Sequence, residues 1–295
     1  MLPDLKSFQV WFVTGSQTLY GPDVLTQVDE NSSNIASALN QDELIPVSII
    51  FKPVVKSAVE INDLCLSANS NKSCIGLILW MHTFSPAKMW INGLKLLQKP
   101  FVQLHTQFNR DIPWKTIDMN FMNLNQSAHG DREFGHICSR MRINRKVITG
   151  HWEEQQVREQ LAVWTRAASA WADWQGARFV RFGDNMRDVA VTDGDKVEAE
   201  LKFGYSVNTH GIGDLRLVIE QVSESDVDKL CEVYLQEYDV VEELKNERKD
   251  SLREAARIEL GIRSFLEKGN YKGFTDTFEV MKKKTLCRNS ISFVW

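Results

Sequence analysis

Short apolar runs alternate with helix-like segments through the first 175 residues, and this alternation restricts the chain to a few folds. The clearest run, residues 74–80 (CIGLILW), is apolar throughout, as expected of a strand buried on both faces of a sheet. Similar runs stand at residues 10–13, 46–52, 101–104 and 146–150. Strands that alternate with helices form parallel sheets covered by helices. The sequence therefore predicts an N-terminal doubly wound, Rossmann-like α/β domain with a parallel sheet over residues 1–175.

The first strand ends abruptly in a polar loop, residues 15–21 (GSQTLYG), and a helical segment follows it. In open parallel sheets, ligands bind outside the carboxyl ends of the strands. Gln17 and Tyr20 are therefore candidates for contact with a polar small molecule. A structural alternative is open: Gln17 caps a turn and Tyr20 packs on a neighbouring helix.

Three further loops share the character of the first and would meet it at the same sheet edge. The four loops are residues 17–20, 82–85, 105–109 and 126–129. They carry hydroxyl, imidazole and amide side chains, whose many donors and acceptors suit a polyhydroxylated ligand. The loops contain neither GxGxxG nor GxxxxGK[ST], so the pattern speaks against a dinucleotide or P-loop site.

Composition restricts the class of protein. A length of 295 residues leaves room for about two domains of ~150 residues each. A net charge of −4 argues against a nucleic-acid partner, which requires a basic face. The longest apolar run, residues 75–81, is far shorter than the ~20 residues of a membrane-spanning helix. Five scattered cysteines without a CxxC pair, and a start without a signal peptide, indicate reduced thiols. We expect a cytoplasmic protein with no nucleic-acid and no membrane partner.

A second unit begins near residue 176. The sequence predicts a strand at 179–182, its resumption at 189–192, and a Gly-rich loop at 206–214. Residues 195–203 alternate between apolar and polar side chains, and a short helix there is an equally open alternative. These elements indicate a second, incomplete α/β domain over residues 176–280.

Two helices are predicted in the later part of this unit. Ser223, with an acid three residues on, begins one of them in the manner of a capping box. The next, at about 247–268, carries Glu259 on its apolar stripe. Because a buried carboxylate has to be paired, we expect a structural salt bridge to a nearby arginine.

Several long motifs resemble the L-arabinose isomerase family from about residue 10 to about residue 279. They are residues 10–21, 80–94 (WMHTFSPAKMWINGL), 105–109, 118–130 (DMNFMNLNQSAHG), 132–134, 181–196 (RFGDNMRDVAVTDGDK), 202–208 and 254–261 (EAARIELG). One departure lies in the opening loop, where Thr18 stands at a position that is usually histidine in the family.

The resemblance implies conversion of L-arabinose to L-ribulose in arabinose catabolism, through an enediolate. A divalent metal, Mn²⁺ in the family, polarises the sugar oxygens, and carboxylates move the proton. The family's two glutamates and two histidines for these tasks lie mostly beyond residue 278, so the resemblance implies that the metal ligands are absent from this chain. His129, Asp131, Glu133 and His136 lie close in sequence, but they form no compact metal motif. No metal ligand and no catalytic residue is assigned.

The resemblance also implies substrate-binding residues and a homo-oligomer whose active site is shared between subunits. Positions that reach across to a neighbouring subunit are Gln17, Leu19, Tyr20, Gln126 and His129. Positions that act within the subunit holding the metal are Met186 and Phe278. The amide and imidazole groups would bond sugar hydroxyls, and Leu19, Met186 and Phe278 would form apolar walls.

The last residues, 281–295, no longer resemble the family, and we interpret them as an aberrant tail from a frameshift or premature stop. The expectation is a truncated isomerase that is inactive alone. Two alternatives stay open. One is a non-catalytic sugar-binding or subunit-assembly module, and the other is an unrelated sugar- or nucleotide-binding α/β protein.

Overall fold

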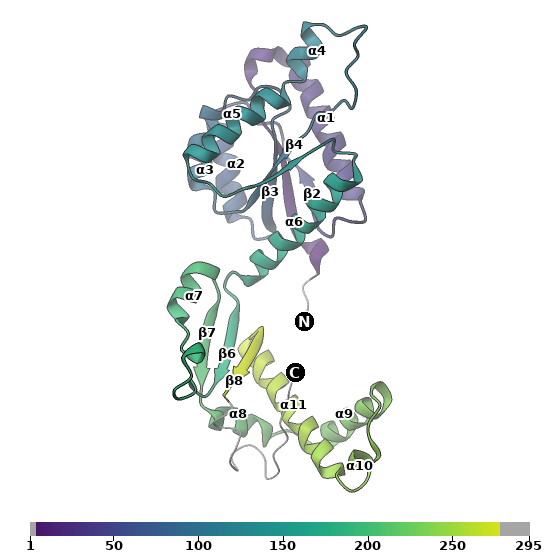
Figure 1. Ribbon diagram of the computed structural model, residues 1–295, viewed down its shortest axis with the longest axis vertical. Helices are drawn as coiled ribbons and strands as arrows, with labels where there is room; N and C mark the ends of the chain where they lie inside the picture. Colours follow the sequence, from purple (N-terminus) through teal and green to yellow (C-terminus); the bar gives the residue numbers. More distant parts are fainter. Residues whose placement is uncertain (1–3, 278–295) are drawn as a thin grey trace. The chain divides into compact units, whose positions relative to one another are not determined.

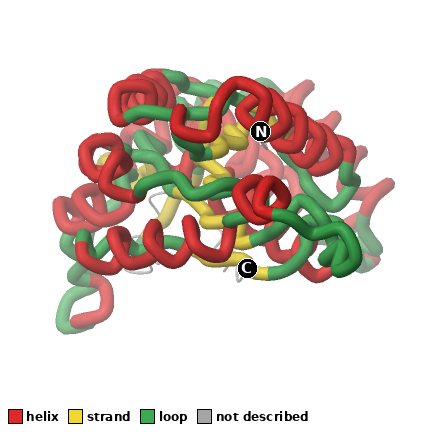
Figure 2. Tube along the Cα trace, turned by 90° about the horizontal axis from the view of Figure 1, so that it is seen from above, coloured by secondary structure: helices red, strands yellow, loops and turns green. Residues whose placement is uncertain are grey.

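The computed structural model describes residues 4–277 of the chain. These residues divide into two compact units, one ending at Ala172 and one beginning at Asp173. Figure 1 shows the elements of each unit, and helices make up more of the trace than strands, as the red and yellow segments of Figure 2 show. Phe278 and the tail at 281–295 lie outside the described residues.

The first unit is built on a five-stranded parallel sheet in the order β2-β1-β3-β4-β5. The strands are β1 (Gln9–Thr14), β2 (Ser48–Phe51), β3 (Cys74–Trp80), β4 (Phe101–His105) and β5 (Lys146–Thr149). The chain moves outward from β1 to β2 and then returns to place β3 on the other side of β1. This reversal creates a topological switch point between β1 and β3, where the loops after the two strands diverge.

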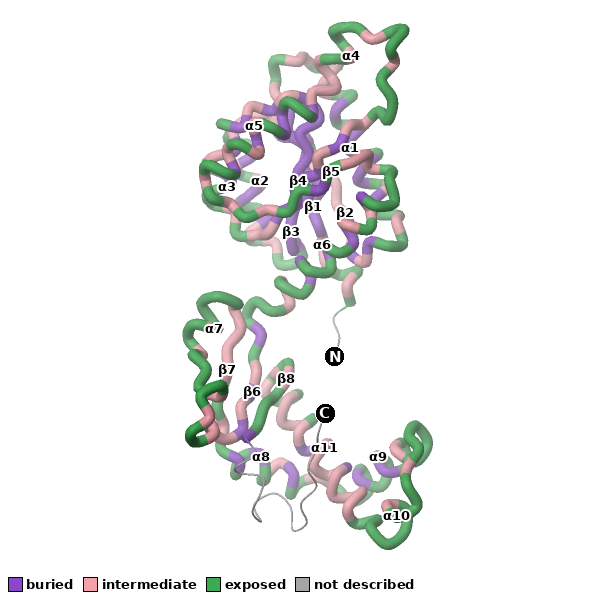
Figure 3. The backbone as a smooth tube through the Cα atoms, viewed as in Figure 1, coloured by how far each residue is buried: buried purple, intermediate pink, exposed green. Residues whose placement is uncertain are grey.

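Helices cover both faces of this sheet (Figure 1). They are α1 (Gly21–Gln41), α2 (Ala58–Ser70), α3 (Ile91–Leu96), α4 (Met119–Leu124), α5 (Ser127–Arg140) and α6 (Gln155–Trp174), with short 3₁₀ turns η1 (Leu5–Ser7), η2 (Thr18–Tyr20) and η3 (Ala87–Trp90). Val10 and Phe12 of β1 belong to the core shared with α1 and α6, whereas the alternate residues Trp11 and Val13 belong to the core shared with α2, α3 and α5. The buried central strands appear in purple in Figure 3. The predicted doubly wound sheet is confirmed, because helices cover both faces and the residues of the central strands β1 and β3 are buried in the two cores.

The second unit contains a three-stranded parallel sheet in the order β7-β6-β8. Its elements are β6 (Arg178–Phe182), η4 (Ala190–Thr192), α7 (Lys196–Phe203), β7 (Ser206–His210), α8 (Ile212–Ile219), α9 (Glu224–Glu237), α10 (Glu242–Lys245), α11 (Lys249–Gly269) and β8 (Gly273–Asp276). Val180 and Phe182 of the central strand pack with α8 and with Phe265 of α11. The predicted second α/β region is therefore confirmed as a parallel sheet with helices.

Two local predictions for this unit are wrong. Residues 206–214 are not a Gly-rich loop, because β7 pairs with β6 along its length and α8 begins directly after Gly211. The predicted strand at 189–192 is replaced by the 3₁₀ turn η4, which covers Ala190–Thr192. At β7, pairing with a distant segment decides the structure, and the local residue types do not reveal that pairing. At residues 190–192 the turn is closed by local hydrogen bonds, including Thr192 Oγ1 to the carbonyl oxygen of Val189.

Two other expectations in this unit are met. Residues 196–203 take the helical alternative: the Asp195 carboxylate caps the first turn, and Gly204, at φ 78°, ends the helix in the left-handed region. Glu259 is paired as expected, with Arg263 Nη2 at 2.5 Å from its Oε1. Its other oxygen accepts a hydrogen bond from the hydroxyl of Tyr234.

Candidate functional site

The candidate site lies at the switch point, where the loops after β1 and β3 meet. The two loops are joined by a buried hydrogen bond of 2.7 Å between the hydroxyls of Ser16 and Thr83. Gly15 fits only because it lacks a side chain, since a Cβ there would lie 2.7 Å from Ser85 Oγ and 2.8 Å from a ring carbon of Trp90. Small residues and buried hydroxyls therefore bring the two loops together.

Gln17 and His129, both predicted from the sequence, are brought together through Phe84. Gln17 Nε2 donates to the carbonyl oxygen of Phe84 at 3.1 Å. The ring of Phe84 stacks on the imidazole of His129, with centroids 4.5 Å apart and planes inclined by 27°. Gly130 follows, and a Cβ on it would lie 2.9 Å from the carbonyl oxygen of Thr83, so α5 approaches the β3 loop closely. The loop after β1 and the first turn of α5 thus present an amide and an imidazole next to Phe84.

The other predicted site residues are placed differently. Leu19 lies on η2 with 82% of its surface exposed, and Tyr20 beside it is half-buried. Gln126 Nε2 donates to Asn123 Oδ1 at 3.2 Å, at the turn between α4 and α5. Met186 belongs to the second unit, where its backbone N–H donates to Thr192 Oγ1 at 3.0 Å. Phe278 lies outside the described residues.

His82, in the loop after β3, is fully buried at the switch point. Its ring stacks on Trp80, with centroids 4.2 Å apart, and its Nε2 lies 2.9 Å from Asn31 Nδ2 of α1. Burial lowers the pKa of His82 to about 4, so the ring is neutral at physiological pH. Because the Asn31 amide nitrogen donates, His82 Nε2 accepts and Nδ1 carries the hydrogen. The ring is a rigid support for the β3 loop.

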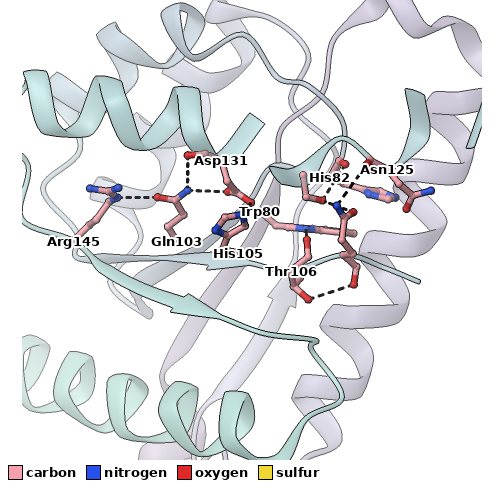
Figure 4. A network of polar contacts seen from close by, with 10 residues as sticks. Trp80, His82, Gln103, His105, Thr106, Asn125, Asp131 and Arg145 are labelled. Carbon is pink, nitrogen blue, oxygen red and sulfur yellow. Dashed lines mark hydrogen bonds and ion pairs between the residues drawn. The ribbon is translucent and has the colours of Figure 1, made fainter. Parts of the chain in front are cut away.

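A second polar cluster, which the sequence did not predict, lies between β4 and α5 (Figure 4). Gln103 Nε2 donates to Asp131 Oδ1 at 2.8 Å, and Arg145 Nε donates to Gln103 Oε1 at 2.8 Å. His105 Nε2 lies 3.6 Å from Asp131 Oδ2. Burial raises the pKa of Asp131 to about 8. The sequence feature that could have revealed this cluster is the glutamine inside an apolar strand, because a buried amide requires a partner.

The acidic and imidazole groups near the start of α5 do not converge. The Asp131 side chain is buried against Gln103, whereas Glu133 Oε2 accepts the backbone N–H of Ala87 at 2.9 Å. His129 stacks on Phe84, and His136 is exposed. Within residues 4–277, no group of three or more His, Cys, Asp or Glu side chains is placed to hold a metal ion. In the same range, no helix is long and apolar enough to cross a membrane.

Both units of the chain match families of known proteins. Residues 4–176 match the family described as the L-arabinose isomerase N-terminal domain, and residues 178–286 match the L-arabinose isomerase central domain. An L-arabinose isomerase from Herpetosiphon aurantiacus is 60% identical over 278 residues, which are 94% of this chain and 56% of the relative. Those from Koribacter versatilis and Geobacillus thermodenitrificans are 56% and 54% identical, over 94% and 93% of this chain and 56% of each relative. The chain thus spans about half the length of the curated relatives it matches.

Proposed function

The chain belongs to the L-arabinose isomerase family, and from this premise we propose that it serves the aldose–ketose isomerisation of L-arabinose to L-ribulose. Its share of that reaction is to bind the hydroxyl groups of the sugar. The observation that carries the proposal is the joint placement of Gln17 and His129 at the switch point, where ligands of open parallel sheets bind.

The chemistry of these two side chains suits a sugar. The Nε2 atom of Gln17 is held by Phe84, which leaves its Oε1 atom, unpartnered within residues 4–277, to accept a hydrogen bond from a hydroxyl. His129 is exposed, and its stacking on Phe84 orients the ring without using its nitrogens. One amide and one imidazole together offer both donors and acceptors, which hydroxyl groups require. Gln126 would add a further amide, and Leu19 and Tyr20 would bound the sugar on the same side. Met186 and Phe278 would bound it from a neighbouring subunit of a homo-oligomer.

The reaction moves a proton between C1 and C2 of the sugar, through an enediolate. Fixing the sugar in one orientation lowers the entropic part of the barrier, which is how binding groups contribute to such a step. Mn²⁺, the metal of the family, would polarise the sugar oxygens. The residues described by the structure offer no ligand set that fits this ion, so we assign no step to it.

Sugar binding can be tested on the purified chain by saturation-transfer NMR with L-arabinose. His129→Ala and Gln17→Ala should each weaken binding about tenfold or more, which corresponds to ~1.4 kcal/mol. His136→Ala is the matched control, because His136 is an exposed histidine on the same helix. Equal binding by the wild type, His129→Ala and Gln17→Ala would contradict the proposal.

An assay of L-ribulose formation tests whether this chain binds the sugar without catalysing its isomerisation. We expect no turnover by the purified chain with Mn²⁺ and L-arabinose, because its described residues bind sugar without supplying a metal site. Measurable Mn²⁺-dependent turnover by the chain alone would overturn this part of the proposal.

A second function, subunit assembly, is favoured by Leu19. A leucine that is 82% exposed at a loop tip is unfavourable in water, and covering such a side chain stabilises by about 1.5–3 kcal/mol. A neighbouring subunit of a homo-oligomer would cover it. Mixing this chain with a full-length family member should give mixed oligomers in native mass spectrometry, and Leu19→Asp should reduce them. Mixed oligomers that are equally abundant with Leu19→Asp would exclude this contact.

A further inference from the structure

A cavity of about 480 Å³ lies beyond the carboxyl ends of β4 and β5. It is distinct from the switch-point surface, because Gln17, Phe84 and His129 do not line it. Its volume falls within the range of ~300–1,000 Å³ that is typical of small-molecule sites. The resemblance and the proposed function leave this cavity without a role.

The cavity is lined by both apolar and polar side chains. Ile117, Phe121 and Met122, from the segment that leads into and forms α4, supply apolar surface. Two histidines also line the cavity: His105 ends β4, and His151 follows the end of β5. Both ring nitrogens of His151 already have partners, Nε2 with the carbonyl oxygen of Phe108 at 3.2 Å and Nδ1 with the backbone N–H of Glu153 at 3.3 Å. His105 is therefore the imidazole open to a ligand. An apolar wall accepts the C–H face of a sugar ring, and imidazole and amide groups bond its hydroxyls.

His105 is the group best prepared to meet a ligand. It is half-buried, lines the cavity, and directs Nε2 toward Asp131, whose Oδ2 lies 3.6 Å away. The Asp131 side chain is fully buried, and its Oδ2 has no hydrogen-bond partner within residues 4–277. A buried carboxyl oxygen without a hydrogen-bond partner is unfavourable whether or not it carries the proton, so a small movement of the His105 ring that closes this gap would be stabilising.

The pairing with Asp131 uses Nε2, and the second ring nitrogen of this cavity-lining histidine, Nδ1, stays open to a ligand. Nδ1 has no hydrogen-bond partner among the residues that the structure describes. When Asp131 is protonated it donates to Nε2, and Nδ1 then carries a hydrogen and donates. When Asp131 is ionised, Nε2 donates to it and Nδ1 accepts. A hydroxyl group satisfies Nδ1 in either state, because it both donates and accepts.

We propose that this cavity is a second small-molecule site, which takes a polyhydroxylated ring compound of monosaccharide size with His105 as the polar anchor. The sugar ring packs on Phe121 and Met122, and one hydroxyl bonds His105 Nδ1. The bond holds the ring of His105 against Asp131, so ligand binding also satisfies the buried carboxyl group.

The test uses the full chain labelled with ¹³C at the methionine methyl groups. Met122 lines the cavity and reports on it, and its signal is assigned with Met122→Leu, which keeps the wall apolar. Met89, which packs in the core beside α2 and α5, is the internal reference. L-Arabinose and D-glucose are added up to about 50 mM, well above a Kd of ~1 mM. We expect at least one of the two sugars to shift Met122 in a saturable manner and to leave Met89 unchanged.

Variants separate this site from the switch-point site. His105→Phe keeps an aromatic ring but removes its nitrogens, and it should abolish the response of Met122. Asn109→Ala, an exposed lining position that does not endanger folding, should weaken the response severalfold. His129→Ala should leave it unchanged. No change of the Met122 signal with either sugar would overturn the proposal, and so would a response that persists in His105→Phe or is not weakened in Asn109→Ala.

Discussion

The two units of the chain both contain parallel sheets, but their sheets are buried to different degrees. In the first unit, every residue of β3 is buried, and helices pack on both faces. In the second unit, β8 is half-buried at its first residue and exposed at the next three, and Phe274 is 43% exposed. The comparison teaches that the same strand type is stabilised to the extent that helices cover it, because most of the stabilisation comes from removing apolar surface from water.

The largest effect should come from matched phenylalanine truncations, one in each unit. Phe134 is fully buried against Trp90 and Phe101, so Phe134→Ala should lower the free energy of unfolding of the first unit by about 3–5 kcal/mol. Phe274→Ala should cost less than about 1.5 kcal/mol in the second unit, because much of its ring already contacts water. Urea unfolding of both variants checks this, and equal losses would break the comparison.

A pH effect should be specific to the first unit. Burial raises the pKa of Asp131 from 3.8 to about 8, so the folded chain retains a proton that the unfolded chain releases between these values. The contribution of this group to stability is therefore fully present below pH 3.8 and is lost as the pH rises toward 8. Asp131→Asn keeps the acceptor for Gln103 and cannot ionise. The free energy of unfolding of this variant should therefore not fall with pH as that of the wild type does, by roughly a few kcal/mol at ~1.4 kcal/mol per pKa unit.

The measurement is the free energy of unfolding of wild type and Asp131→Asn from pH 4.5 to pH 8. Glu133→Gln is the control, since Glu133 lies on the same helix and is only half-buried. Parallel curves for wild type and Asp131→Asn would show that the buried carboxyl group does not control this dependence.

The smallest effect should be the same in both units, because it is local. Ser57 caps α2 and Ser223 caps α9, and each Oγ accepts a backbone N–H at 3.2 Å. Ser57→Ala and Ser223→Ala should each cost about 1 kcal/mol. Thermal unfolding of the two variants provides the measurement. A large difference between them would mean that burial around the helix, and not the cap itself, sets the cost.

Local patterns predicted much of the first unit. Continuous apolar runs revealed its strands, and capping residues such as Ser223 revealed helix starts also in the second unit. They failed at β7, whose residues do not resemble a buried strand and which forms by pairing with β6. They also missed α5, which begins in a polar stretch and acquires its buried face only against η3 and β4.

The sequence by itself determined the alternation of strands and helices, the polar loops at the strand ends and the family motifs. These follow from neighbours in the chain, whose spacing sets which side chains share a face. Only the tertiary structure decided that Gln17 meets His129 through Phe84, and that His105 faces the buried Asp131. Such pairs lie far apart in the chain, and their contact depends on strand order and helix packing, which no local spacing encodes.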